Sequence, residues 1–196
     1  MEPHDRIKAE LMDARDLDRT LSRMARQVIE IINPEQDPMK SFGLIGMQTR
    51  GVYIARRLQK KIAEAESIDV PVGVLDVTMY RDDIRIRLKQ PVVRATHVPF
   101  DIGDRRLILV DDVLYTGRTA RAALDALVDM GRPASVNLLV VVDRGLRELP
   151  ICADIVGRQV PTLPGEEVRV RLQELDKLEG VWLVENPRAH AERAND

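Results

Sequence analysis

Cysteine is nearly absent from the chain, and this excludes two kinds of protein. Cys152 is the only cysteine, so neither an intrachain disulfide framework nor a cysteine-based zinc cluster can form.

Long apolar runs are absent as well. No stretch approaches the roughly 20 apolar residues that a membrane-spanning helix needs. The first residues lack the basic and apolar regions of a signal peptide. We therefore expect a cytoplasmic protein without a membrane partner.

Aromatic side chains and net charge are scarce as well. Aromatic residues make up 3% of the chain, so stacking on aromatic platforms is not expected to be the main mode of any RNA binding. A formal net charge of −2 argues against a general nucleic-acid coat, and we expect no DNA partner. It remains compatible with a local basic face. The 196 residues, 44% of them hydrophobic, suit one globular domain with a sizeable core.

Apolar runs alternate with segments of helical period along most of the chain. Strands are predicted at residues 7–12, 42–47, 72–80, 107–111 and 135–142, and helices at residues 14–32 after the cap Asp13, 51–65 and 118–130. This alternation predicts an α/β fold with a central, mostly parallel, twisted sheet flanked by helices.

Short strand patterns replace the long helices in the last third of the chain. We expect residues 1–186 to form one domain, in which the N-terminal strand and about residues 150–185 make a small β-rich hood. Residues 187–196 form a polar tail that we expect to be disordered.

The most informative segment is residues 107–119, LILVDDVLYTGRT. Its apolar run reaches Asp111 and Asp112, and a loop with hydroxyl groups and Gly117 then leads into a helix. Open α/β sheets bind ligands at the carboxyl ends of their strands. Backbone N–H groups, hydroxyls and a helix N-terminus suit a phosphate monoester, and the carboxylate pair suits a sugar diol. The segment therefore predicts a ribose 5-phosphate site.

Three other polar segments say less when each is read alone. Residues 46–51, GMQTRG, are either an anion site at a helix start or an ordinary strand-to-helix turn. Residues 78–83, TMYRDD, are typical of a solvated loop, and residues 143–151, DRGLRELPI, show no chemistry by themselves.

Together, these segments resemble the motifs of the PyrR family of type I phosphoribosyltransferases. VDDVLYTGRT resembles the family's motif for phosphoribosyl pyrophosphate (PRPP), IGMQTRG its pyrophosphate loop, and residues 143–151 its segment beside the base. The resemblance covers about residues 13–185. It implies the type I phosphoribosyltransferase fold, the conversion of uracil and PRPP to UMP and pyrophosphate, and transcription attenuation of pyrimidine genes through uridine-nucleotide-dependent binding to an mRNA leader.

The resemblance also implies roles for single residues. Asp111, Asp112 and Arg50 would be catalytic, and Thr49 and Arg50 would bind pyrophosphate. Arg144 and the backbone near Val168 would meet the base. The remaining substrate contacts would come from Val113, Leu114, Tyr115, Thr116, Gly117, Arg118 and Thr119, and a flexible loop would carry Tyr80, Arg81, Asp82, Asp83 and Arg94. Mg²⁺ would be held mainly by PRPP and water, so no protein metal site is expected.

RNA contacts are implied at four positions, Ser22, Arg26, Arg147 and Arg158. The family commonly has a histidine and an arginine where this chain has Leu146 and Cys152, so one possible phosphate contact is lost. The other arginines of the first helix, Arg15, Arg19 and Arg23, fit a phosphate-binding face and an ordinary solvated helix face equally well.

Three functions stay open at this point. The first is a uracil phosphoribosyltransferase and the second is an RNA-binding attenuation protein that senses UMP or UTP, and one protein can have both functions. A salvage phosphoribosyltransferase without RNA binding, acting on uracil or on a purine, is the alternative. By resemblance we expect a homodimer or a dimer of dimers.

Overall fold

The computed structural model describes residues 6–32, 37–80 and 96–185, and its centre is a five-stranded parallel sheet in the order β3-β2-β4-β5-β6. The strands are β2 (Phe42–Met47), β3 (Val72–Leu75), β4 (Arg106–Leu114), β5 (Ser135–Asp143) and β6 (Ile155–Gln159). Every residue of β2 is buried, as expected for a parallel strand covered on both faces.

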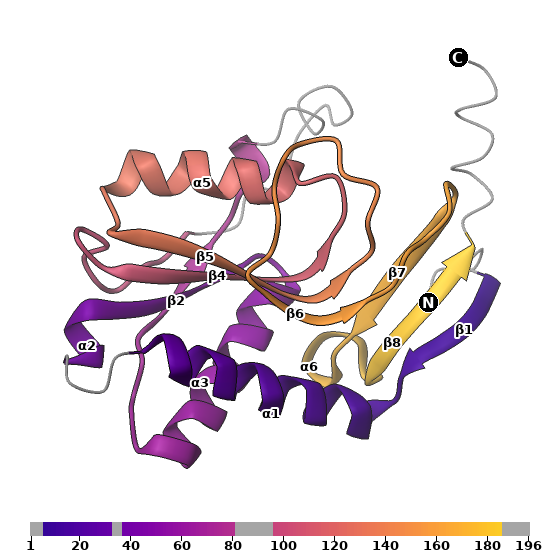
Figure 1. Cartoon of the computed structure of the whole chain (residues 1–196), viewed down its shortest axis with the longest axis horizontal. Helices are drawn as coiled ribbons and strands as arrows, with labels where there is room; N and C mark the ends of the chain where they lie inside the picture. The colour runs from indigo at the N-terminus through magenta and orange to yellow at the C-terminus, as the bar shows by residue number, and fades with distance from the viewer. Residues whose placement is uncertain (1–5, 33–36, 81–95, 186–196) are drawn as a thin grey trace.

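Helices cover both faces of this sheet (Figure 1). Helices α1 (Ala14–Ile31) and α3 (Arg50–Glu66) lie on one face, and α5 (Arg118–Met130) lies on the other. Successive residues of β4 alternate between the two layers, because Ile108 packs with the α1 and α3 side while Leu109 packs with α5. Within the described residues, no helix is long and apolar enough to cross a membrane.

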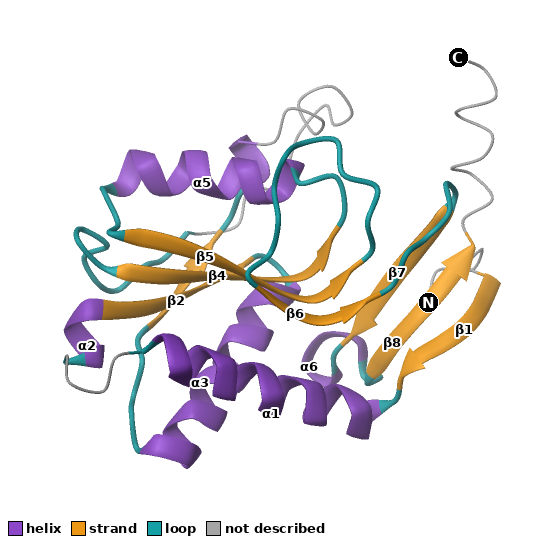
Figure 2. Cartoon of the chain, viewed as in Figure 1, coloured by secondary structure: helices purple, strands orange, loops and turns teal. Residues whose placement is uncertain are grey.

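A second, smaller sheet stands beside the first and forms the hood (Figure 2). It is antiparallel, in the order β1-β8-β7, with β1 (Arg6–Met12), β7 (Glu166–Arg171) and β8 (Gly180–Glu185). A short helical turn, α6 (Gln173–Asp176), joins β7 to β8. The N-terminal strand thus pairs with the C-terminal one, whereas β6, which lies within the residues expected to form the hood, belongs to the parallel sheet.

Residues 72–80 do not form the single strand that was predicted. Strand β3 ends at Leu75, and residues Thr78–Tyr80 form a 3₁₀ turn. The cause is Asp76, whose Oδ1 accepts hydrogen bonds from the backbone N–H of Thr78 at 2.9 Å and from its hydroxyl at 2.6 Å. This local bonding competes with the sheet ladder and turns the chain.

Two smaller differences concern the end of β4 and an additional helix. The motif strand β4 was expected to end at the acid pair but runs on to Leu114, so both carboxylates lie within it. A short helix, α2 (Pro38–Ser41), was not predicted. The predicted cap of α1 is confirmed, because Asp13 Oδ1 accepts the backbone N–H of Asp16 at 2.7 Å. The expected tail at residues 187–196 lies outside the described residues.

Candidate active site

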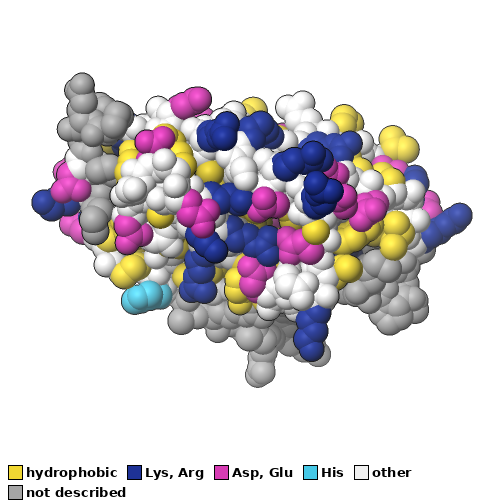
Figure 3. Space-filling view, turned by 90° about the horizontal axis from the view of Figure 1, so that it is seen from below, with side chains coloured by type: hydrophobic (Ala, Val, Ile, Leu, Met, Phe, Trp, Pro, Cys, Tyr) yellow, Lys and Arg dark blue, Asp and Glu magenta, His cyan; other side chains and the backbone are white. Residues whose placement is uncertain are grey.

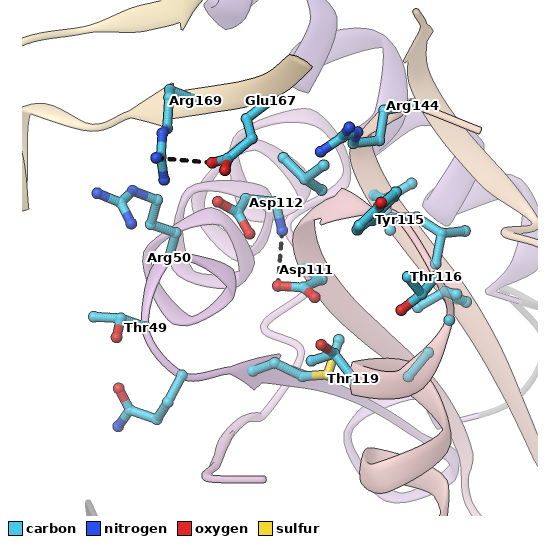
Figure 4. A pocket seen from close by; sticks show the side chains of 18 residues that line it. Thr49, Arg50, Asp111, Asp112, Tyr115, Thr116, Thr119, Arg144, Glu167 and Arg169 are labelled. Carbon is cyan, nitrogen blue, oxygen red and sulfur yellow. Dashed lines mark hydrogen bonds and ion pairs between the residues drawn. The ribbon is translucent and has the colours of Figure 1, made fainter. Parts of the chain in front are cut away.

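A cavity of about 490 Å³ lies where the carboxyl ends of β2 and β4 face strand β7 of the hood (Figure 4). Eleven of the predicted substrate residues line it, namely Thr49, Arg50, Asp111, Asp112, Val113, Leu114, Tyr115, Thr116, Gly117, Thr119 and Arg144. Segments far apart in the sequence thus converge at one edge of the sheet, as parallel strands require.

Asp111 and Asp112 bring two carboxylates into this cavity (Figure 4). The backbone N–H of Asp112 donates to Asp111 Oδ1 at 2.9 Å, which fixes the orientation of the first carboxylate. Strand β4 is held in register by β5, where Asp111 is opposite Val140. Among the residues that the structure describes, no cluster of three or more His, Cys, Asp or Glu side chains is arranged to hold a metal ion.

The loop between β4 and α5 begins a helix at the cavity wall. Gly117 has a φ of 91°, a left-handed conformation that suits glycine, and the helix starts directly after it. Thr116 Oγ1 accepts the backbone N–H of Arg118 at 3.3 Å. Arg118 itself does not line the cavity, because its Nε donates to Glu148 at 2.8 Å on the outer side of the loop.

Residues 143–151 form the support of this loop, a role that the sequence analysis missed. The backbone N–H groups of Glu148 and Leu149 donate to the Thr116 carbonyl at 3.0 and 3.1 Å. The guanidinium of Arg147 donates to the Tyr115 carbonyl at 2.7 Å and to the Ile151 carbonyl at 2.9 Å. Two backbone carbonyls of the loop, those of Tyr115 and Thr116, are therefore held by residues 143–151, so the loop has a preformed shape.

Arg144 is a buried arginine at the wall between sheet and hood, with 5% of its surface exposed. Its guanidinium lies 4.0 Å from the centre of the Tyr115 ring and donates to Thr162 Oγ1 at 3.1 Å and to the Glu166 carbonyl. Burial lowers the pKa of Arg144, but an arginine stays protonated at neutral pH. A fixed positive charge therefore stands beside the aromatic face.

The loop between β2 and α3 carries Thr49 and Arg50, and the peptide bond between Gln48 and Thr49 is cis. Gly51 allows α3 to approach the sheet, since a Cβ there would lie 2.2 Å from the Val110 carbonyl oxygen. Arg50 reaches the cavity while its Nη2 donates to Asp176 Oδ1 at 2.8 Å.

Strand β7 contributes two cavity residues that sequence reasoning did not find, Glu167 and Arg169, which form an ion pair of 2.7 Å. Val168 between them is buried and does not line the cavity with its side chain. The available signal was the alternation of charged and apolar residues along β7, because every second residue of a strand lies on the same face of the sheet.

The predicted flexible loop is only partly described. Tyr80 is exposed and donates its hydroxyl to Asp129 Oδ2 of α5 at 2.8 Å. That hydrogen bond raises the pKa of Tyr80. Arg81, Asp82, Asp83 and Arg94 lie outside the described residues.

The four residues implied for RNA do not share one environment. Ser22 and the exposed Arg26 lie on α1, and Ser22 accepts a hydrogen bond of 2.9 Å from Lys61 of α3. Arg158 of β6 lies beside α1 and shares a shallow pocket with Arg19 and Arg23. Arg147 instead lies with the loop after β4, as described above. Figure 3, which views the molecule from the α1 side, shows basic and acidic side chains intermixed.

Comparison with known proteins agrees with this geometry. Residues 10–174 match the model of the phosphoribosyl transferase domain. "Bifunctional protein PyrR" of Deinococcus deserti is 51% identical over 176 residues, covering 90% of this chain and 94% of the relative. The protein of the same name from Thermus aquaticus is 51% identical over 180 residues, covering 92% and 97%.

Solved structures with the same fold are much more distant in sequence. The hypoxanthine phosphoribosyltransferase of Trypanosoma cruzi in complex with IMP has a TM-score of 0.70 at 16% identity, covering 96% of each chain. The corresponding enzyme of Staphylococcus aureus has a TM-score of 0.66 at 17% identity, covering 93% of this chain and 94% of that one. The fold is confirmed by these structures, and the domain match together with the close relatives places this chain in the PyrR family of phosphoribosyltransferases.

Proposed function

We propose that the protein transfers the 5-phosphoribosyl group of PRPP to N1 of uracil, giving UMP and pyrophosphate. The observation that carries the proposal is one cavity with a carboxylate pair, a helix-starting hydroxyl loop and Arg50 on separate walls. Phosphate, ribose diol and pyrophosphate each find a chemically matched partner there.

In the reaction, the bond from the anomeric carbon to the pyrophosphate oxygen breaks and the bond to N1 of uracil forms, while N1 loses its proton. Positive charge develops on the ribose ring as pyrophosphate leaves. Asp111 and Asp112 orient the diol and place negative charge near that ring, and Arg50 stabilises the negative charge on the leaving group. Thr116 and Thr119, with the N–H groups at the start of α5, hold the 5-phosphate.

Mg²⁺ is proposed as the metal that accompanies PRPP. The donor set fits, because Asp111 and Asp112 supply the hard carboxylate oxygens that Mg²⁺ prefers. The described residues hold no group of three or more His, Cys, Asp or Glu side chains that could bind a metal by themselves. When bound, Mg²⁺ neutralises part of the charge on the pyrophosphate. The two carboxylates would contact it directly or through water, and the substrate would supply the remaining ligands.

The base is proposed to lie between sheet and hood. Arg144 and the Tyr115 ring form a flat, cationic wall there, and the backbone of β7 near Val168 offers hydrogen-bonding groups at the same end of the cavity. Uracil presents carbonyl oxygens and N–H groups on one edge, which such a wall and a strand backbone can match. Oxopurines have a similar edge, so the choice of uracil is supported by the close relatives, which are named bifunctional protein PyrR.

We propose RNA-dependent regulation as the second function, with UMP or UTP as the signal and a pyrimidine-gene mRNA leader as the target. It is supported by the word "bifunctional" in the relatives' names and by arginines on α1 and β6 that lie next to one another. Ser22, Arg26 and Arg158 are proposed as direct contacts. For Arg147 the contacts with the loop after β4 favour an indirect role. We further propose a cytoplasmic homodimer or dimer of dimers.

The transferase proposal is tested by measuring UMP formation from uracil, PRPP and Mg²⁺, with hypoxanthine, guanine and orotate as competing bases. We expect turnover with uracil alone. Turnover with a purine would overturn the proposed base specificity. The absence of turnover with every base, combined with tight UMP binding, would leave a nucleotide sensor on a transferase fold.

RNA binding is tested with Arg26→Gln and transcripts of pyrimidine-gene leaders, in the presence of UMP. If Arg26 contacts a phosphate, the variant should bind RNA more weakly. The slope of the logarithm of the binding constant against the logarithm of the salt concentration should also be smaller in magnitude by about 1. Arg132→Gln, at an exposed position after the C-terminal end of α5 on the other face of the sheet, is the matched control. Equal loss in both variants would indicate a general charge effect, and no RNA binding by the unaltered protein would refute the second function.

A further inference from the structure

Asp176 connects the hood to the pyrophosphate loop. It lies at the end of α6, and 14% of its side chain is exposed. Its Oδ1 accepts from Nη2 of Arg50 at 2.8 Å and from Nη1 of Arg171 at 2.9 Å. Its Oδ2 accepts the backbone N–H of Leu172 at 3.0 Å. One carboxylate therefore fixes an arginine of α3, an arginine of β7 and the turn between the hood strands.

The carboxylate of Asp176 is ionised at neutral pH. Burial by itself raises the pKa of Asp176, but the hydrogen bond from the Leu172 N–H and the hydrogen bond and charge of Arg50 lower it below its ordinary value. Two guanidiniums that meet at one oxygen would repel each other without this negative charge. Asp176 thus allows Arg50 and Arg171 to stay close together.

Arg50 keeps hydrogen-bonding capacity while it is held in this way. It lines the cavity with 27% of its side chain exposed. Within the described parts of the chain, its buried Nε has no hydrogen-bond partner. Because that atom is enclosed, an anion in the cavity meets the exposed part of the side chain, and a guanidinium carries five N–H donors. The side chain is therefore both fixed in direction and still able to donate.

We propose that Asp176 is a positioning residue that orients Arg50 for the pyrophosphate group of PRPP. The inference rests on the proposed transferase function and deepens it. Orienting the guanidinium before the substrate arrives reduces the conformational entropy lost on binding. Arg50 lines the cavity whereas Arg171, the other arginine partner of Asp176, does not, so we expect the effect of Asp176 mainly at the pyrophosphate end.

The alternative is that Asp176 only ties the hood to the sheet. The chain offers a matched control for that role in Glu179. Its carboxylate pairs with Arg57 of α3 at 2.5 Å and accepts the backbone N–H of Gln173 at 2.9 Å. Glu179 therefore has the same kind of ties to the same two elements, but Arg57 does not line the cavity.

The test compares the equilibrium binding of Mg²⁺–PRPP and of UMP by calorimetry in Asp176→Ala, Asp176→Asn and Glu179→Ala. UMP lacks the pyrophosphate group but uses the proposed phosphate loop and base wall. We expect Asp176→Ala to weaken PRPP binding roughly tenfold and to leave UMP binding within about twofold. Asp176→Asn retains an oxygen that accepts from Arg50 but lacks the negative charge, so its PRPP affinity should fall between those of Asp176→Ala and the unaltered protein. Glu179→Ala should bind both ligands normally.

Unchanged or tighter PRPP binding by Asp176→Ala would overturn the inference, and so would equal losses for PRPP and UMP. The same inference predicts that Asp176→Ala has no further effect on PRPP affinity once Arg50 is replaced by alanine, and additive losses would contradict it. Because PRPP binding is measured without a base, failure of the uracil reaction in the unaltered protein remains a separate result.

Discussion

The parallel sheet and the hood differ in the contacts that supplement their apolar packing. Strands β2, β4 and β5 pack through buried apolar side chains, and two helical layers cover them. The hood shares the apolar core on the α1 and α3 side, through residues such as Met12, Val170 and Val181, and adds ion pairs that span long distances in sequence, such as Lys8 with Glu166 and Arg50 with Asp176. The proposed phosphate and ribose end of the cavity rests on the sheet, whereas the hood borders the proposed base and pyrophosphate ends. We infer that the first end is rigid and the second adjusts to ligands and to solution conditions.

The largest expected effect concerns the sheet side, through Asp112→Asn. The variant keeps the shape of the side chain but removes a negative charge beside the ribose, so kcat/KM for PRPP should fall by at least about a hundredfold. The Tm should stay near that of the unaltered protein, because the fold does not depend on this carboxylate. Asp125→Asn, on the exposed surface of α5, is the control. Full activity of Asp112→Asn would refute the ribose role.

An intermediate effect is expected from Gly51→Ala, which tests the rigidity of the sheet. The new Cβ would lie 2.2 Å from the Val110 carbonyl oxygen, and backbone atoms cannot move aside cheaply. We expect a loss of about 3 kcal/mol in the free energy of unfolding, measured by urea denaturation. Gly103→Ala is the control, since its Cβ would meet only the Asp101 side chain, at 3.2 Å. A loss below about 1 kcal/mol at Gly51 would show that the helix and sheet adjust easily.

The smallest effect is expected from mild acid, which should loosen the hood before the sheet. Hydrogen bonds from the Leu163 N–H and from Lys8 lower the pKa of Glu166 below its ordinary value of 4.5. A carboxyl with a lowered folded pKa stabilises the protein above its unfolded pKa, and this contribution is lost as pH falls through the folded value. The loosening should therefore begin below about pH 4.5.

Trp182, the single tryptophan, lies in β8 and reports on the hood by fluorescence. Helical circular dichroism reports mainly on α1, α3 and α5. During acid titration we expect the fluorescence change to precede the loss of helical signal, and Glu166→Gln should make the fluorescence change depend less on pH. Coincident transitions in the unaltered protein would mean that hood and sheet unfold as one unit. That result would contradict the inferred difference in rigidity between them.

The sheet and its motif could be predicted from the sequence because their signals are local. An unbroken apolar run predicts β4, and the acid pair, the hydroxyl residues and Gly117 follow within a few residues. The hood contacts could not be predicted in the same way. Asp176 lies 126 residues from its partner Arg50, and nothing in the sequence near either residue indicates the pairing. Even the strand pattern of residues 72–80 was misleading, because the side chain of Asp76 turned the backbone.

The contacts of Arg147 could not be predicted from its residue type either. The family resemblance implies an RNA contact at this position, and the structure shows that its guanidinium donates to backbone carbonyls of its own protein. The deciding factor is the register of β4 and β5, which places Leu114 opposite Asp143 and thereby brings the two following loops together. Register is a property of the folded sheet and could not be read from residues 143–151 alone.

Residues 143–152 support the loop after β4 through Arg147 and end in an exposed cysteine, which makes the protein easy to label near its cavity. Cys152 is exposed and is the only thiol in the chain, so a maleimide dye would attach at one known place. Its neighbour Ile151 gives its carbonyl to Arg147, which in turn holds the Tyr115 carbonyl at the edge of the cavity. A dye on that sulfur would stand one residue away from the hydrogen bonds that shape the phosphate loop. Its emission would offer a direct optical readout of ligand arrival and departure in real time.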